Sequence, residues 1–542
     1  MATRGYLAVV LHAHLPFVRH PEHPDFLEER WLFEAISECY LPLLAALGRV
    51  AADHVPGRIA LSISPALGAM LEDPLLRARY RQHLARLLDL AAREVTLTRG
   101  GPEAAVAQFH RDWLERTQQQ YEALGGDLLA ACRTLRAAGV LELLTTTATH
   151  GFLPLLKTHA PAVRAQLAVG AEFFRRAFGP TRGLWLPECA FYPGLETELR
   201  AQGFSWFVVD THGLHHASHR PQHGVLAPIA CPNGVAAFGR DPDSSRQVWS
   251  AQEGYPGDFF YREFHRDIAH QRSLEHLGPC LLDGAIRVPT GLKYWRVTGS
   301  DEKALYEPER AQERVREHAR HFVAARCAQL ARAAPGMDRP PLALAPYDAE
   351  LFGHWWFEGP QFLEQVLREA AAGGLELLTP SDYLDRHPVL QCATPGASSW
   401  GWQGYHECWL NGGTEWIYPH LHQAARVMTA LADRWPAEPP GSLRARALNQ
   451  AARSLLLAQA SDWPFLIKCG TAVDYASRRV REQLARFHHL AESVTGQRID
   501  ERTLRALEAM DNAFPWLDYR AWRSAEPAVL DKSAPGEAAA SA

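Results

Sequence analysis

The segments GLWLPE (residues 183–188) and LALAPYD (residues 342–348) share one design. Each is an apolar run of strand length in which a proline comes shortly before an acid, Glu188 in one and Asp348 in the other. Such a run places a carboxylate at the carboxyl end of a buried strand, where α/β barrels gather their functional side chains. We therefore expect an α/β fold in which these two acids converge.

Strand and helix alternate along the chain to about residue 385, which predicts a parallel α/β architecture. The further strands are expected near residues 6–11, 59–63, 141–145, 206–210 and 375–378. Residues from about 66 to 138 have helical periodicity and are too many for an ordinary crossover, so we expect a helical insertion there. The segment 211–240 is rich in His, Pro and Gly and is expected to be loop with short β segments.

The character of the chain changes after residue 385. Residues 386–525 carry helical periodicity with little strand signal, so they predict a C-terminal α-helical domain that follows a first domain of residues 1–385. The last residues, 526–542, are mostly Ala, Ser, Pro and Glu, a composition typical of a disordered tail.

Composition excludes several classes of partner. The net charge of -5 over 542 residues is spread without a basic stripe, which argues against a nucleic-acid partner and favours an uncharged ligand. The nine cysteines are scattered singly and form no C-x-x-C pair. This pattern indicates reduced thiols rather than a disulfide framework or a zinc site.

The first residues of the chain do not look like a targeting signal. Residues 1–14 contain one arginine and a short apolar run, and they lack the apolar core and cleavage site of a signal peptide. We expect no apolar stretch that approaches the roughly 20 residues of a membrane span. The sequence therefore predicts a cytoplasmic protein without a membrane partner.

Histidines follow the first expected strand. His12 and His14 are two residues apart, so both side chains point to the same face. Such a pair can bind a metal or hydrogen-bond a ligand, and the alternative is that both are polar residues closing a barrel mouth. His150 and His354 hold similar positions at or after strand ends, where a single histidine is more often structural.

Tryptophans cluster beside these motifs. Flat aromatic faces among polar side chains suit sugar rings, which present an apolar face and a rim of hydroxyl groups. The competing interpretation is that most of the sixteen tryptophans are core residues. The residues in question are Trp295, Trp355, Trp356, Trp400, Trp402, Trp409 and Trp463.

Two carboxylates in an aromatic-rich surround point to glycosidic bond chemistry, in which one acid attacks or activates water and the other protonates the leaving oxygen. Two other classes stay open. One is a metal-dependent deacetylase or mannosidase that uses His12 and His14 as ligands, and the other is a carbohydrate-binding protein without chemistry. Chelator sensitivity would favour the metal enzyme. Loss of turnover without loss of binding in Glu188→Gln would exclude the binding protein.

Several motifs, taken in order, resemble those of glycoside hydrolase family 57. They are HAHLP (12–16), THGF (149–152), LWLPECA (184–190), PYDAELFGHWW (346–356) and SDWPF (461–465). Within that family, GYPG (254–257), YREFHR (261–266) and YWRVT (294–298) resemble the 1,4-α-glucan branching enzymes. The resemblance runs from about residue 5 to 520.

The resemblance implies an incomplete (β/α)7 barrel with a small helical insertion and a C-terminal α-helical domain that completes the substrate cleft. It implies that Glu188 is the nucleophile and Asp348 the general acid/base, and that no metal or cofactor takes part. Asp348 must then stay protonated near neutral pH, and Trp355 or Trp356 could supply the apolar surround. The substrate-binding residues that it implies are His12, His14, His150, Arg262, Trp295, His354, Trp400, Trp409, Asp462 and Trp463.

The implied substrate is an α-glucan such as amylose, glycogen or maltodextrin, and the implied reaction cleaves α-1,4 links and forms α-1,6 branches. Branching members of the family carry a long loop after the strand that matches residues 206–210, with a tyrosine that covers the catalytic centre. Here that segment is short, and no tyrosine occurs between Tyr192 and Tyr255. An α-amylase-like hydrolase is therefore an alternative, with the metal-dependent deacetylase or mannosidase as a further one.

Overall fold

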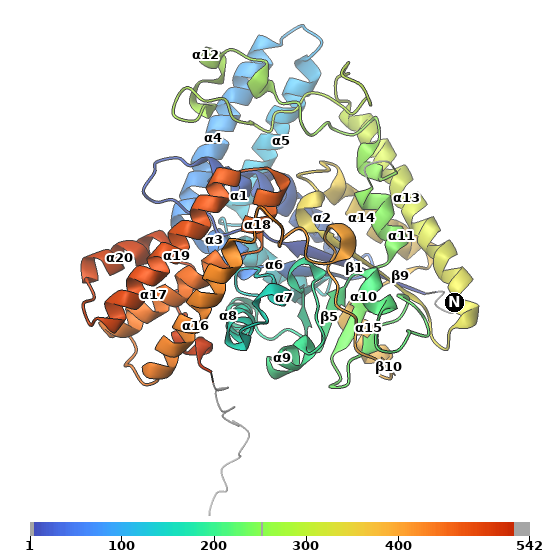
Figure 1. Ribbon diagram of the computed structural model, residues 1–542. Coiled ribbons are helices and arrows are strands. Elements are labelled where there is room, and N and C mark those ends of the chain that lie inside the picture. Colours follow the sequence, from blue (N-terminus) through green and yellow to red (C-terminus); the bar gives the residue numbers. More distant parts are fainter. Residues whose placement is uncertain (1–4, 251–252, 525–542) are drawn as a thin grey trace, which may run out of the picture.

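The computed structural model describes residues 5–250 and 253–524, and its strands form two sheets (Figure 1). In the first sheet the order is β3-β2-β1-β8, and β9 also pairs with β1. The strands are β1 (Tyr6–Ala13), β2 (Ile59–Ile63), β3 (Leu141–Leu144), β8 (Leu342–Asp348) and β9 (Glu376–Leu377). All of these pairs are parallel, and the register sets His12 opposite both Ser62 and Asp348. Their carboxyl ends therefore lie along one edge.

The second sheet has the order β10-β6-β7-β5-β4. Its strands are β4 (Gly183–Leu184), β5 (Trp206–Val209), β6 (Ile229–Ala230), β7 (Ala236–Gly239) and β10 (Gln391–Cys392). Only the β6–β7 pair is antiparallel. A parallel bridge between Thr145 and Leu184 connects the end of β3 to β4, so the two sheets meet there.

Two local expectations differ from the structure. The apolar run 183–188 is a strand only at β4, because Pro187 opens a 3-10 turn (Pro187–Cys189). Segment 211–240, expected to be loop with short β segments, contains the short strands β6 and β7 and differs from the expectation in its helix α10 (Thr211–His215). Strand β7 pairs with β5 along its whole length, and its four residues are buried.

Helices pack on the outside of the strands (Figure 1). Helices α13 and α14 pack against each other, and α14 packs on α2. These crossover and covering helices are α2 (Leu41–Ala52), α7 (Leu153–Leu156), α8 (Ala160–Phe178), α9 (Leu195–Ala201), α11 (Pro242–Trp249), α13 (Pro308–Ala333), α14 (Gly359–Gly373) and α15 (Pro380–Arg386).

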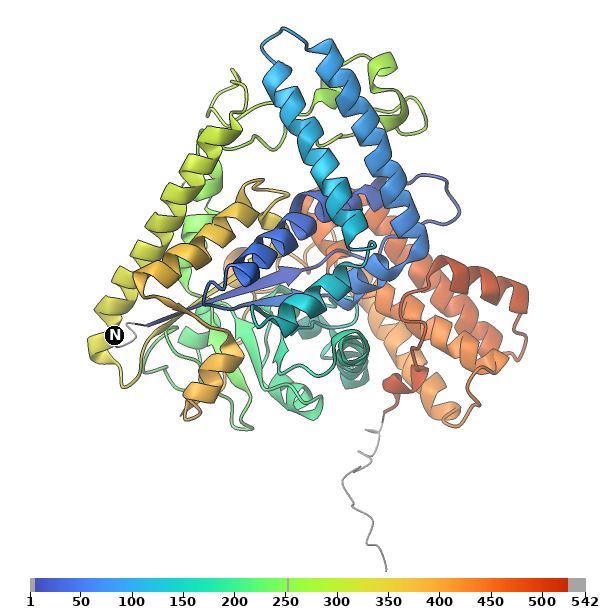
Figure 2. The same cartoon turned by 180° about the vertical axis from the view of Figure 1, so that it is seen from behind.

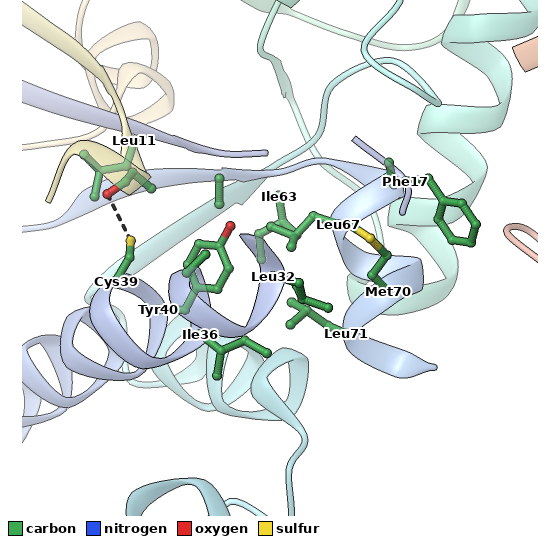
Figure 3. Packing of buried hydrophobic residues seen from close by; sticks show 14 of the residues in the cluster. Leu11, Phe17, Leu32, Ile36, Cys39, Tyr40, Ile63, Leu67, Met70 and Leu71 are labelled. Atoms are coloured by element: carbon green, nitrogen blue, oxygen red, sulfur yellow. Dashed lines mark hydrogen bonds between the residues drawn. The ribbon is translucent and has the colours of Figure 1, made fainter. Parts of the chain in front are cut away.

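The first helical stretch crosses the middle of the core. It consists of a 3-10 turn (Leu27–Glu29), α1 (Arg30–Ala35), a π-helical turn (Ile36–Tyr40) and α2. Figure 3 shows Ile36 and Tyr40 of this stretch among the buried side chains that follow β2. By length and composition alone, Leu27–Ala52 could cross a membrane, which corrects the expectation that no such stretch exists. However, 67% of its apolar window is buried inside the structure, as for a core helix.

A helical hairpin extends from the connection between β2 and β3 (Figure 2). The connection comprises α3 (Pro65–Glu72), α4 (Pro74–Leu97), α5 (Ala104–Ala123) and α6 (Leu128–Ala137). The outer part of the hairpin carries a second excursion, residues 253–307, which includes α12 (Leu274–Leu277) (Figure 2). Arg272 and Tyr294 of this excursion bind the buried Glu94 of α4. The two excursions therefore form one unit beside the sheets.

The C-terminal part of the described chain is helical. It contains α16 (Ile417–Arg434), α17 (Leu443–Ala458), α18 (Asp462–Cys469), α19 (Val473–Thr495) and α20 (Glu501–Met510), and α17 packs on α19. These helices lie on one flank of the sheets (Figure 1). The tail predicted to be disordered, residues 526–542, lies outside the described residues.

Candidate active site

A cavity of about 820 Å³ opens beside the residues that end β1, β4 and β8. Most of the predicted site residues line it, although they come from segments far apart in the sequence. Those that line it are His12, His14, His150, Glu188, Asp348, Trp400, Trp409 and Asp462. The two acids that the strand ends predicted therefore do converge on one site.

Glu188 is held in one orientation. Its backbone has a φ of 60° in the 3-10 turn after β4, a left-handed conformation that costs a non-glycine residue about 1–3 kcal/mol. The indole N–H of Trp400 donates to Oε2 at 2.8 Å, and the hydroxyl group of Ser461 donates to Oε1 at 2.9 Å. Both bonds favour the ionised carboxylate and leave it fixed at the cavity wall.

Asp348 is in a different environment. It is the last residue of β8, and no hydrogen bond among the described residues engages its carboxyl group. Burial raises its pKa well above the usual range, and the charges of Glu350 and Glu188 raise it further. Burial also raises the pKa of Glu188, but the bonds from Trp400 and Ser461 oppose that effect. The proton of the pair therefore rests on Asp348 and the charge on Glu188.

The apolar surround of Asp348 is not the one expected. Trp356 is 1% exposed, and its ring packs on Phe362 at 4.8 Å, away from the cavity. Trp355 lines the cavity but is 55% exposed, so its ring does not enclose Asp348 in an apolar surround. The raised pKa comes instead from general burial and from the neighbouring carboxylate of Glu350.

Hydrogen bonds link two buried histidines to the nucleophile candidate. His12 Nδ1 bonds Ser62 Oγ at 3.0 Å, and His12 Nε2 bonds His150 Nε2 at 3.0 Å. His150 Nδ1 bonds Ser461 Oγ at 2.9 Å, and Ser461 in turn holds Glu188. Burial lowers the pKa of both histidines, so each ring is neutral and has one donor and one acceptor, as this chain of bonds requires.

His14 differs from His12 and His150, because its pKa is raised rather than lowered. Its Nδ1 bonds Ser64 Oγ at 2.8 Å, and its Nε2 bonds Asp462 at 3.0 Å. Burial alone would lower its pKa, but the carboxylates of Asp462, Glu350 and Glu188 together outweigh burial and raise it. Helix α18 thus brings a carboxylate from the C-terminal helices to the end of β1.

His14, His150 and Asp462 are also the group to consider for a metal ion, since one ligand atom of each lies within 4.8 Å of the others. The rings of His14 and His150 are stacked, with centroids 4.0 Å apart and 25° between their planes. Ring nitrogens coordinate along lone pairs in the ring plane, and in stacked rings these run side by side rather than converge on one ion. The group therefore suits hydrogen bonding better than metal coordination.

Four predicted binding residues do not line this cavity, so their binding role stays a prediction. Arg262 is 4% exposed and pairs with Glu38 at 2.9 Å, and His354 Nδ1 bonds the same Glu38. Trp463 is 1% exposed, and its indole N–H donates to the carbonyl of Leu457. Trp295 lies under the guanidinium of Arg266 in the 253–307 excursion. In this structure each of these side chains contacts a neighbouring segment of the protein.

Several other residues of the site were not predicted from the sequence. Glu350 accepts from the His14 backbone N–H at 3.1 Å and from the Tyr40 hydroxyl group at 2.5 Å, and its place two residues after Asp348 is a signal that could have found it. Ser461 opens the SDWPF motif, but only tertiary contacts show that it binds Glu188. No sequence signal marks Arg240, just after β7, or Trp249 of α11, which both line the cavity.

The arrangement suits an uncharged, ring-shaped ligand. Indole faces line the cavity around one protonated and one ionised carboxyl group, which is the chemical division that glycosidic bond cleavage requires. The tryptophans of the lining are Trp249, Trp355, Trp400, Trp402 and Trp409.

Comparison with known proteins agrees with this reading. A family model described as glycosyl hydrolase family 57 matches residues 8–393, and one described as the C-terminal part of 1,4-alpha-glucan branching enzyme matches residues 420–522. A 1,4-alpha-glucan branching enzyme of Thermococcus kodakarensis is 34% identical over 98% of this chain and 80% of its own.

Two crystal structures share the fold over nearly the whole chain. The alpha-amylase AmyC from Thermotoga maritima has a TM-score of 0.90 and 39% identity, covering 97% of this chain and 100% of its own. The branching enzyme of family 57 from Pyrococcus horikoshii has a TM-score of 0.86 and 33% identity, covering 97% of this chain and 98% of its own. With the family model matched over more than half of its length, the chain belongs to glycoside hydrolase family 57.

Proposed function

We propose that the chain is a 1,4-α-glucan branching enzyme that cleaves α-1,4 links and transfers the released segment to form α-1,6 branches in a glycogen- or starch-like glucan. The observation that carries this proposal is the division of labour between Glu188 and Asp348 at one cavity. The branching-enzyme model matched over the C-terminal helices and the similarity to branching enzymes over nearly the whole chain support it.

The proposed reaction is a retaining double displacement. Asp348 gives its proton to the glycosidic oxygen while Glu188 attacks the anomeric carbon, so the C–O bond breaks and a glucosyl ester forms on Glu188. Asp348, now ionised, removes the proton from the 6-hydroxyl group of an acceptor glucan. The acceptor oxygen then displaces Glu188, which returns to the carboxylate held by Trp400 and Ser461.

We also propose that the strands form the incomplete (β/α)7 barrel of the family. The parallel bridge from β3 to β4 supports this, as does the bond from the backbone N–H of Asp241, just after β7, to the carbonyl of Leu344 in β8. With these links the path runs through β1, β2, β3, β4, β5, β7 and β8. We further propose residues 1–385 as the catalytic domain and 386–525 as the helical domain that completes the cleft through Asp462 of α18.

A second candidate function is hydrolysis of α-glucan. If water replaces the acceptor hydroxyl group, the same intermediate yields a reducing end. Two observations favour this candidate. The segment between β5 and β7 is short and lacks a tyrosine, and AmyC, titled an alpha-amylase, is similar over nearly the whole chain.

Proton NMR of amylose after incubation with the purified protein separates the two candidates. New α-1,6 linkages are counted against new reducing ends. We expect many branches per reducing end. Mostly reducing ends would establish the hydrolase instead, and no change in either signal would contradict both candidates.

The roles of the two acids have their own test. We expect Glu188→Gln and Asp348→Asn each to lower turnover at least about 10³-fold, because each removes a group that acts in both half-reactions. The melting temperature should stay close to that of the wild type. Glu313→Gln, on the exposed face of α13, is the matched control and should leave turnover unchanged. Near-normal turnover in either acid variant would contradict the assignment.

A further inference from the structure

Trp402 lies at the rim of the cavity. Its side chain is 63% exposed although it lines the cavity, so a large apolar face is left in contact with water. An open indole face costs free energy unless a ligand covers it, and a sugar ring is the apolar, flat partner that this site would supply. Its exposure is thus a candidate binding feature rather than a core position.

The loop that carries Trp402 is rigid. Gln403 has a φ of 63°, a left-handed conformation that a non-glycine residue keeps only when its surroundings impose it. The Trp402 backbone N–H donates to Cys408 Sγ at 3.2 Å, and the Ser399 backbone N–H donates to the carbonyl of Gly404 at 2.8 Å. The exposed ring is therefore presented by an ordered turn.

Helix α10 contacts this turn and holds it in place. His212 Nε2 bonds the carbonyl of Gly404 at 2.8 Å, and the His212 ring meets the Tyr405 ring edge-on at 5.6 Å. The backbone N–H of Gly396 donates to the carbonyl of Gly213 at 2.8 Å. The short segment that follows β5 is thus used to hold the Trp402 turn in place.

The same segment contacts Glu188. Trp400 lies two residues before Trp402, and its indole N–H holds Glu188 at 2.8 Å. The ammonium group of Lys468 lies over one face of the Trp402 ring, 5.7 Å from its centre, and Lys468 also lines the cavity. A glucan that stacks on the opposite face of Trp402 would therefore share the cavity with Lys468 and Glu188.

We propose that Trp402 is a specificity-determining residue: it is the platform on which the incoming acceptor glucan stacks, and it thereby favours transfer to a sugar hydroxyl group over transfer to water. This inference rests on the proposed function. Water is present at roughly 55 M and glucan ends at about millimolar, so transfer needs a bias of about 10⁴-fold or more, which a bound acceptor must supply.

The test compares Trp402→Ala with Trp402→Phe. Each is incubated with amylose, and α-1,6 linkages formed are divided by reducing ends released. We expect this ratio to fall about tenfold in Trp402→Ala, the factor that corresponds to about 1.4 kcal/mol, because the stacking surface is lost. Trp402→Phe, which keeps an aromatic face, should stay within about threefold of the wild type.

Phe259→Ala is the matched control, since Phe259 is 56% exposed but does not line the cavity, and it should leave the ratio unchanged. If the wild-type enzyme is active and its ratio equals that of Trp402→Ala, the inference about Trp402 is wrong, but the proposed function is unaffected. A wild-type protein that forms neither branches nor reducing ends would overturn the proposed function and the inference with it.

Discussion

At the scale of single residues, hydrogen bonding separates the roles of two buried acids. Both oxygens of Glu188 accept from fixed donors, Trp400 and Ser461, whereas the carboxyl group of Asp348 has no such donor among the described residues. Glu350 adds a second carboxylate beside Asp348 and is held by Tyr40 and the backbone of His14. Repulsion from that charge, added to burial, keeps the proton on Asp348.

The variant Glu350→Gln tests this interpretation. Removing the negative charge lowers the pKa of Asp348, so the acid loses its proton at a lower pH and the alkaline limb of the kcat/KM profile moves to lower pH. Tyr40→Phe removes a bond to Glu350 but keeps the charge, so its alkaline limb should stay closer to that of the wild type. An alkaline limb that does not move in Glu350→Gln would contradict the role of the charge.

At the scale of elements, the π-helical turn Ile36–Tyr40 holds the loop after β8. Cys39 Sγ donates to the carbonyl of Ala349 at 3.0 Å, and Glu38 binds His354 at 2.9 Å. Gly353 packs directly on the backbone of Glu38, where a Cβ atom would lie 1.9 Å from the carbonyl oxygen. Insertions of this kind into helices are frequent at functional sites, and this one positions the loop that follows Asp348.

Gly353→Ala is expected to disrupt that contact. Its φ of 121° is unfavourable for a residue with a side chain, and the added Cβ would clash with backbone that cannot easily move. We expect the free energy of unfolding to fall by about 3 kcal/mol or more, together with turnover. Urea denaturation measures the first quantity. Gly336→Ala, which meets open space, is the control and should change stability by less than about 0.5 kcal/mol.

At the scale of the whole molecule, the helical hairpin and the 253–307 excursion are joined by buried polar groups. Glu94 is fully buried and binds Arg272, Tyr294 and His276 from the excursion. The hairpin also buries two histidines, His83 of α4 and His110 of α5. Burial, and for His83 the charges of Arg30 and Arg86, lowers the pKa of each to about 3.

These histidines make stability depend on pH. Between pH 6.5 and 3 the unfolded chain binds protons at both positions and the folded chain does not, so the free energy of unfolding falls as the pH falls. Each histidine lowers the free energy of unfolding by about 2 kcal/mol between pH 7 and pH 5. Urea denaturation measures the free energy of unfolding at pH 7 and at pH 5. The difference between these two values should be smaller in His83→Gln than in the wild type, by about 2 kcal/mol. An unchanged difference would contradict the prediction.

The sequence by itself determined the α/β character, the helical C-terminal region, the family and the pair of acids. These depend on local patterns, because an apolar run that ends at an acid specifies both a buried strand and the place of its carboxylate. The position of β7 was not predictable in this way, since its four residues carry too little periodicity to separate a strand from a loop.

Only the tertiary structure decided which histidines and tryptophans face the cavity. Trp400 and Trp463 have the same chemical character, yet Trp400 holds Glu188, whereas Trp463 is buried on the inner side of its own helix, α18. Likewise, Arg262 and His354 bind Glu38 and do not line the cavity. The physical reason is that a side chain's exposure depends on which distant segments pack against it, and no local pattern in the chain records those contacts.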